Sequence, residues 1–323
     1  MNIELVEVGP RDGLQSEGVI LPTVAKIALI ERLIGAGLRR IEVTSFVNPR
    51  RVPQMADAEA VLAGLPRGNG VSYIGLVLNR KGFDRARAAA CDAVGMAVVA
   101  SETFNRRNQG VGTDESIAAW RDIAVAARAA GIQPNVTIST AFGCPFEGEM
   151  DPARVLEVAL RCAEAQPVEI ALADTIGVAV PSQVADLFGA LRERLPGMPL
   201  RAHFHNTRNT GLANVYAAIG AGVRAIDASV GGIGGCPFAP AATGNVPTED
   251  VLYMLNRMGI RTGVSIADLI ETALWLERQI GKPVPGMLVK AGNFPRGQGA
   301  SPPSSPVPAP PAANARNLTS IVP

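Results

Sequence analysis

The chain has 323 residues, with 30 Lys and Arg against 29 Asp and Glu, so its formal net charge at pH 7 is +1. This balance provides no excess of positive charge to hold a phosphate backbone, which argues against nucleic acid as a partner. Hydrophobic residues make up 47% of the sequence, but they lie in short runs, so we expect no membrane partner. The N-terminus has no signal- or transit-peptide pattern and the four cysteines have no C-x-x-C spacing, which predicts a soluble, cytoplasmic protein.

The first predicted strand covers residues 3–8, and the first helix follows over 23–36, where Val24, Ile27, Ile30 and Ile34 recur at helical spacing. The same alternation of short apolar runs with longer amphipathic stretches continues along the chain. Further strands are predicted over 40–44, 71–77, 93–99, 133–139, 169–173, 200–205 and 225–229. Helices are predicted over 53–62, 81–90, 113–130, 152–164, 182–195, 210–221 and 248–258.

Strands that are each followed by a helix predict an α/β fold of the (β/α)8 or TIM barrel type, in which parallel strands close inside a ring of helices. A doubly wound sheet is the alternative, but no Gly-rich nucleotide-binding turn follows the first strand. One additional C-terminal helix is expected over 265–280. Residues 1–295 are expected to form the barrel domain with this extension, and the Pro-rich residues 296–323 a disordered tail.

The only two histidines of the chain, His203 and His205, stand one residue apart in a predicted strand. Because side chains i and i+2 lie on the same face of a strand, both imidazoles should point the same way and offer half of a metal site. The alternative interpretation is a pair of hydrogen-bonded polar residues at a strand end. The concentration of all histidines in one H-x-H motif favours the metal.

A barrel also predicts where an active site lies, because such sites are built from the C-terminal ends of the strands and the loops that follow them. Unusual polar residues gather at this end of the predicted strands. In chain order they are Arg11, Asp12, Glu42, Ser45, Thr137, Asp174, His203, His205, Cys236 and Asn245. Their convergence at one end of the barrel indicates an enzyme.

Several motifs in fixed order carry a resemblance to a known family. They are EVGPRDGLQ at 7–15, IEVTSFV at 41–47, DTIG at 174–177, HFH at 203–205 and GGCP at 234–237. With these motifs, the chain from about Ile3 to about Ile280 resembles 3-hydroxy-3-methylglutaryl-CoA lyase, one of the barrel metallolyases with an Arg-Asp motif.

The resemblance implies a divalent cation held by Asp12, His203, His205 and Asn245. A carboxylate, two imidazoles and an amide oxygen without thiolate suit Mg²⁺ or Mn²⁺ as the cofactor. It also implies an acyl-CoA substrate as partner, and we expect a homodimer or larger homo-oligomer.

The implied reaction is a retro-Claisen cleavage of 3-hydroxy-3-methylglutaryl-CoA to acetyl-CoA and acetoacetate. Arg11 would stabilise the enolate oxygen, and Glu42 would hold the guanidinium in place. His203 or Asp174 would relay the hydroxyl proton, and Cys236 would protonate the acetyl-CoA carbanion. The expected substrate-binding residues are Arg11, Gln15, Ser45, Thr137 and Arg208.

Two departures from the family pattern concern the acyl group. Residues 206–209 read Asn-Thr-Arg-Asn where the family usually has Asp-Thr-Tyr-Gly, and Thr137 stands where the family has a tyrosine. A smaller side chain enlarges the acyl pocket, and Arg208 adds a possible carboxylate clamp. The alternative substrates are therefore (R)-citramalyl-CoA, which would give acetyl-CoA and pyruvate, or a bulkier 3-hydroxyglutaryl-CoA derivative. A related aldolase or condensing enzyme on the same scaffold is a further alternative.

Structural interpretations stay open for individual residues. Arg11 and Asp12 could form an ion pair at the barrel rim, and Asp174 could cap the following helix. Cys236 could be an inert buried thiol. A barrel that binds metal without catalysis is the alternative from another functional class.

Overall fold

The computed structural model describes residues 2–235 and 244–294, and its centre is a closed barrel of parallel strands in the order β1 to β8. Register pairs from Glu4 with Ala225 to Glu7 with Ala228 join β1 to β8 and close the barrel. The strands are β1 (Glu4–Glu7), β2 (Arg40–Ser45), β3 (Ser72–Leu76), β4 (Ala93–Val99), β5 (Gln133–Ser139), β6 (Glu169–Asp174), β7 (Leu200–Phe204) and β8 (Ala225–Ala228). The predicted (β/α)8 barrel is confirmed.

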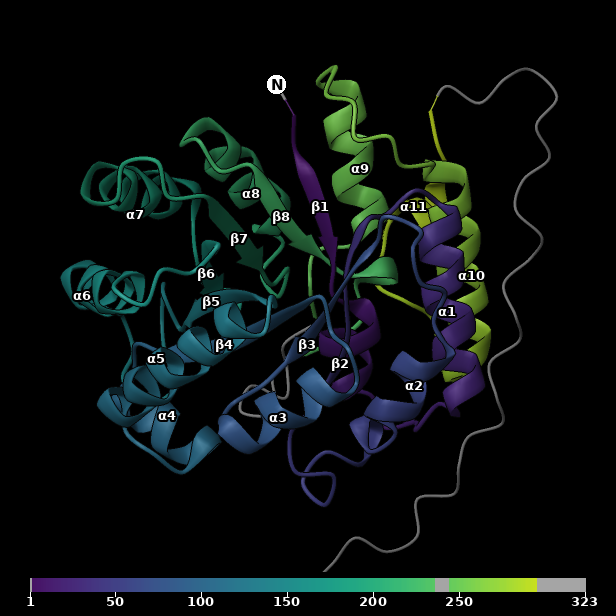
Figure 1. Cartoon of the computed structure of the whole chain (residues 1–323). Coiled ribbons are helices and arrows are strands. Elements are labelled where there is room, and N and C mark those ends of the chain that lie inside the picture. The colour runs from purple at the N-terminus through teal and green to yellow at the C-terminus, as the bar shows by residue number, and fades with distance from the viewer. Residues whose placement is uncertain (1, 236–243, 295–323) are drawn as a thin grey trace, which may run out of the picture.

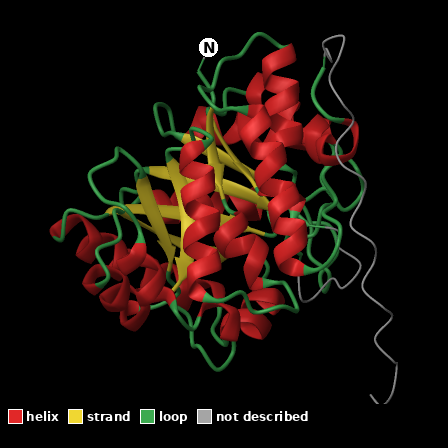
Figure 2. Cartoon of the chain, turned by 90° about the vertical axis from the view of Figure 1, so that its right-hand side faces the viewer, coloured by secondary structure: helices red, strands yellow, loops and turns green. Residues whose placement is uncertain are grey.

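Helices surround the strands on the outside, as the two side views show (Figures 1 and 2). Their apolar faces pack on the barrel because the predicted helical spacing places apolar residues on one side. The main helices are α1 (Thr23–Gly35), α2 (Ala58–Gly64), α3 (Arg80–Ala88), α5 (Thr113–Ala129), α6 (Pro152–Ala163), α7 (Pro181–Arg194), α8 (Gly211–Gly220) and α9 (Thr248–Arg257).

The helix predicted over 53–62 is in fact two elements, a 3-10 turn η2 (Pro53–Met55) and α2. Asp57 stands between them with non-helical backbone angles. Its carboxylate accepts hydrogen bonds from Lys26 Nζ at 2.5 Å and Thr23 Oγ1 at 2.7 Å. These contacts with α1 therefore accompany the break in the helix.

Four short elements were not predicted. The turn η1 (Gly9–Gly13) is of π type, because the amides of Gly13 and Leu14 donate to the carbonyls of Val8 and Gly9, five residues earlier. The helix α4 (Glu102–Gln109) buries only Phe104 and Asn105, so it has no apolar periodicity to reveal it. The remaining two are the 3-10 turn η3 (Val230–Gly232) and α11 (Leu288–Ala291).

The helix expected after the barrel is present as α10 (Ile266–Ile280), and it packs on α1. Ser265 begins it by accepting a hydrogen bond from the Asp268 amide at 3.3 Å. The predicted tail over 296–323 and its boundary lie outside the described residues. No helix in the described part of the chain is both long enough and apolar enough to cross a bilayer.

Candidate active site

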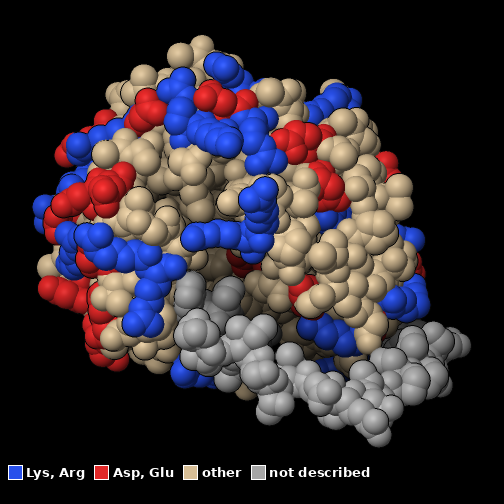
Figure 3. Space-filling model, turned by 90° about the horizontal axis from the view of Figure 1, so that it is seen from below, with Lys and Arg blue, Asp and Glu red and all other residues tan. Residues whose placement is uncertain are grey.

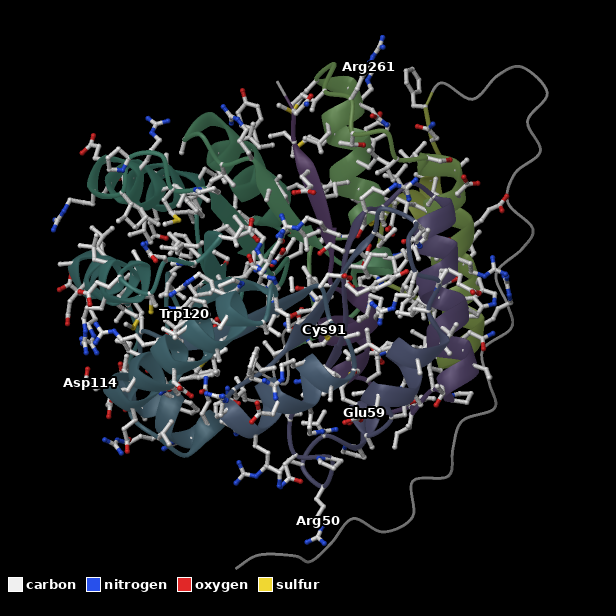
Figure 4. The ribbon with its side chains drawn as sticks, viewed as in Figure 1. Arg50, Glu59, Cys91, Asp114, Trp120 and Arg261 are labelled. Atoms are coloured by element: carbon white, nitrogen blue, oxygen red, sulfur yellow. The ribbon has the colours of Figure 1, made fainter. Side chains whose placement is uncertain are left out.

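A cavity of about 580 Å³ opens at the C-terminal ends of the strands. Arg50, which follows β2, marks this end at the bottom of the side view, whereas Arg261, which follows α9, marks the opposite end (Figure 4). Seen from below, the same face is hollowed near its centre and carries basic side chains around the hollow (Figure 3). The polar side chains within the cavity include Arg11, Asp12, Gln15, Glu42, Thr137, Arg201, His203, His205 and Asp227.

Three of these side chains form a cluster that could hold a metal ion. Asp12 lies in η1, His203 in β7 and His205 directly after β7, and each offers one ligand atom within 4.8 Å of the other two. The two imidazole rings lie with their centroids 5.2 Å apart. The prediction that both histidines face the same side is confirmed.

Asn245, from the segment between η3 and α9, lies beside Asp12 of this cluster. Its Nδ2 donates to Asp12 Oδ2 at 2.9 Å and to the Ile233 carbonyl at 3.1 Å. Its Oδ1 is buried and has no hydrogen-bond partner among the described residues, and the same holds for His205 Nδ1. Buried polar atoms normally have partners, so these unpaired atoms, with the donor set around them, fit a divalent cation.

The electrostatics of the cluster keep two of its members in the form that binds metal. Burial alone would raise the pKa of Asp12, but Arg11, His203 and His205 outweigh it and lower the pKa to about 2. Burial and the neighbouring His203 lower the pKa of His205 to about 4. At neutral pH, Asp12 is therefore a carboxylate and His205 a neutral imidazole, as metal ligation requires.

Arg11 is fixed beside the cluster by two carboxylates. Its Nε and Nη2 lie 2.7 and 2.6 Å from Glu42 Oε2, and its Nη1 donates to Asp12 Oδ1 at 2.7 Å. The hydrogen bonds from Nε and Nη1 use two of the five N–H groups of the guanidinium, Nη2 forms an ion pair with Glu42, and Arg11 also lines the cavity. The structure thus brings Arg11, Glu42 and Asp12 together.

The expected substrate-binding residues fall into two groups. Gln15 and Thr137 line the cavity, whereas Ser45 is buried behind it and donates to Gln15 Oε1 at 3.2 Å. Arg208 does not line the cavity, because its Nη1 donates to the carbonyls of Ile176 and Gly177 at 3.2 and 2.9 Å. Its position therefore does not support the predicted carboxylate clamp.

Asp174 also lies outside the lining of the cavity. Its two carboxylate oxygens accept hydrogen bonds from the amides of Val178 and Ala179 at 2.9 and 3.0 Å. Asp174 therefore stabilises the loop between β6 and α7, which favours the interpretation of this residue as structural rather than catalytic. Cys236 lies outside the described residues, whereas Gly235 before it lines the cavity.

Sequence reasoning missed two charged residues of the cavity, Asp227 of β8 and Arg201 of β7. Asp227 Oδ2 lies 3.1 Å from His203 Nδ1, and Asp227 Oδ1 accepts from Arg201 Nη1 at 3.1 Å. Arg201 could have been found, because it stands two residues before His203 and so shares its face of the strand.

Comparison with known proteins identifies the family. The family model described as HMGL-like matches residues 2–275. The hydroxymethylglutaryl-CoA lyase of Pseudomonas mevalonii is 44% identical over 279 residues, which cover 86% of this chain and 93% of that protein. The (R)-citramalyl-CoA lyase of Chloroflexus aurantiacus is 42% identical over 300 residues, which cover 90% of this chain and 95% of that protein.

A solved structure of a member of the same family is also similar to this chain. The HMG-CoA lyase from Acinetobacter baumannii, in complex with coenzyme A and 3-methylmalate, matches with a TM-score of 0.88 and 38% identity. The match covers 95% of this chain and 98% of that one. The resemblance inferred from the sequence motifs is confirmed, and the chain belongs to the HMGL-like family.

Proposed function

We propose that the chain is a divalent-cation-dependent carbon–carbon lyase that cleaves 3-hydroxy-3-methylglutaryl-CoA to acetyl-CoA and acetoacetate. The observation that carries this proposal is the cluster of Asp12, His203 and His205 in the same cavity as the fixed guanidinium of Arg11. Further support comes from the relatives named as hydroxymethylglutaryl-CoA lyases and from the related structure that holds coenzyme A.

Asp12, His203, His205 and Asn245 would hold the cation, and their oxygen and nitrogen donors favour Mg²⁺ or Mn²⁺. When bound, such a cation supplies Lewis acidity toward the oxygens of the substrate. The homo-oligomer and the cytoplasmic location expected from the sequence stay predictions.

The chain's own residues account for the charge that develops during cleavage. When the C2–C3 bond breaks, its electron pair moves to the thioester and forms the enolate of acetyl-CoA. The N–H groups of Arg11 that contact neither Glu42 nor Asp12 would donate to the enolate oxygen. Because Glu42 holds the guanidinium from the other side, little reorientation is needed as the charge forms.

Proton transfer is the second requirement. Of the two residues expected to take the hydroxyl proton, His203 lines the cavity and Asp174 does not. Because His203 Nδ1 faces Asp227, His203 would take this proton on Nε2, and only while Nε2 is not bound to the cation. Cys236 stays the predicted donor to the acetyl-CoA carbanion, on the strength of the family resemblance alone.

(R)-citramalyl-CoA is the second candidate substrate. The observation that favours it is the 42% identity with the Chloroflexus aurantiacus enzyme. The two substrates differ by one methylene between the reacting carbon and the carboxylate. A single methylene in a pocket changes kcat/KM by only about 10–200-fold, so both substrates must be compared directly.

The test is to incubate the purified protein with Mn²⁺ and each acyl-CoA in turn, and to measure acetyl-CoA, acetoacetate and pyruvate. The proposal predicts acetoacetate from the methylglutaryl substrate and loss of activity when EDTA removes the cation. Pyruvate from citramalyl-CoA without acetoacetate from the other substrate would make the second candidate correct. Binding of Mn²⁺ without turnover on either substrate would contradict both and favour a non-catalytic barrel.

A further inference from the structure

A chain of alternating charges runs from the cavity into the interior of the barrel. It begins at His203 Nδ1, which lies 3.1 Å from Asp227 Oδ2, and continues from Asp227 Oδ1 to Arg201 Nη1 at 3.1 Å. Arg201 Nε lies 3.1 Å from Glu169 Oε1, and the same oxygen is 2.5 Å from Arg40 Nη2. Each charge except that of Arg40 is nearly or fully buried.

The register of the barrel brings the first pair together. His203 and Asp227 are direct neighbours across the parallel pairing of β7 with β8. Arg201 lies on the same face of β7 as His203, so it reaches the other oxygen of the same carboxylate. Asp227 pairs with the guanidinium of Arg201, which stays charged, so Asp227 is a carboxylate and only accepts hydrogen bonds.

This arrangement determines where the proton of His203 lies. Because Asp227 only accepts, the contact requires that His203 Nδ1 carries the hydrogen. The lone pair of a neutral His203 is then on Nε2, which is 4.0 Å from Asp12 Oδ2. His205 differs, since its Nδ1 has no hydrogen-bond partner among the described residues.

We propose that Asp227, held by Arg201, is a positioning residue that fixes the tautomer and the ring orientation of His203 and so completes the cation site. The proposal rests on the cation site of the proposed function, and it adds two residues that the sequence motifs did not contain. A carboxylate behind a ligating histidine commonly has this role in metal sites, where its loss weakens metal binding by about 10–100-fold.

The hydrogen bond from Arg201 to Asp227 leads to a specific prediction for the variant Asp227→Asn. The Arg201 guanidinium only donates, so it should pair with the amide oxygen of the new side chain. The amide nitrogen then faces His203 Nδ1 and donates to it, which moves the imidazole proton to Nε2, on the side of the cation site. The double variant Asp227→Asn with Arg201→Met removes one negative and one positive charge together and frees the amide to turn.

The experiment uses protein labelled with ¹⁵N in histidine, and since the chain has only two histidines, each ring is readily resolved. NMR in the absence of metal, at a pH where the His203 ring is neutral, should show the Nδ1–H tautomer of His203 in the wild type, Nε2–H in Asp227→Asn, and Nδ1–H again in the double variant. The signal of His205 reports that the fold is intact. Mn²⁺ affinity, measured by EPR, should fall about 10–100-fold in Asp227→Asn and recover in part in the double variant.

A wild-type His203 with its proton on Nε2 would overturn the proposal, whether or not the variants fold. An unchanged tautomer and unchanged Mn²⁺ affinity in Asp227→Asn would overturn it as well. If the wild type shows the predicted tautomer but binds no Mn²⁺, the cation site of the proposed function fails, whereas the positioning of His203 by Asp227 holds.

Discussion

At the scale of single residues, Arg11 links Glu42 to Asp12, one of the possible metal ligands. It contacts Glu42 through two nitrogens and Asp12 through a third, and it lines the same cavity as the possible metal ligands. A planar fork with several donors is required for these simultaneous contacts, and the ammonium of lysine cannot reproduce it.

We therefore predict that Arg11→Lys lowers kcat by about 100–1,000-fold with a smaller change in KM, because it removes donors aimed at the developing enolate. Steady-state kinetics on the acyl-CoA that the wild type cleaves would measure both constants. Arg208→Lys is the matched control, since Arg208 lies outside the lining of the cavity. It should keep kcat/KM within about twofold of the wild type. Equal losses in the two variants would refute the assignment of Arg11.

At the scale of elements, the Glu7 carboxylate joins four segments beneath the site. It accepts hydrogen bonds from the amides of Gly9 and Val230, both at 2.8 Å, and from Thr248 Oγ1 at 2.7 Å. The end of β1 is thereby connected to η1, η3 and α9. Since η1 carries Arg11 and Asp12, this contact helps to set the position of the active-site turn relative to the last strand.

Burial of Glu7 predicts a pH dependence of stability. Burial, partly offset by the hydrogen bonds from Thr248 and the two amides, raises the pKa of Glu7 from 4.5 to about 7. Between these values the folded state binds more protons than the unfolded state, so stability falls as the pH rises from about 4.5 to about 7. Glu7→Gln cannot lose a proton, and its free energy of unfolding should fall less over this range, by up to about 3 kcal/mol.

Urea unfolding at pH 5 and at pH 7.5 checks this prediction for the wild type and Glu7→Gln. The control is Glu31→Gln on the exposed face of α1, whose unfolding free energy should follow the wild type. A pH dependence that is the same in all three proteins would show that Glu7 is already ionised in the folded state at pH 5.

The elements that the sequence did not predict share a physical cause. The helix α4 contains mostly charged and polar residues, and the break before α2 accompanies contacts of Asp57 with a different helix. Periodicity detects segments that bury a continuous apolar face, and neither feature depends on one. The π-type turn η1 depends on backbone hydrogen bonds between residues five positions apart, which no residue pattern specifies.

At the scale of the whole molecule, the barrel and the position of its cavity could be predicted, because alternating apolar runs define the strands and closure brings their C-terminal ends together. The grouping of the possible metal ligands was predictable for the same reason, together with the H-x-H spacing of His203 and His205. The contact of His203 with Asp227 was not, since it requires the register between β7 and β8. The direction of the Arg208 side chain was not predictable either, since it depends on hydrogen bonds to the carbonyls of Ile176 and Gly177.

The central claim is that one divalent cation binds between Asp12, His203, His205 and Asn245 at the mouth of the barrel. The most direct measurement is anomalous X-ray scattering from crystals grown with Mn²⁺. The account predicts one strong anomalous peak per chain, within about 2.0–2.6 Å of a ligand atom of each of these residues. A map with no peak at this position, from crystals of protein that binds Mn²⁺ in solution, would contradict it.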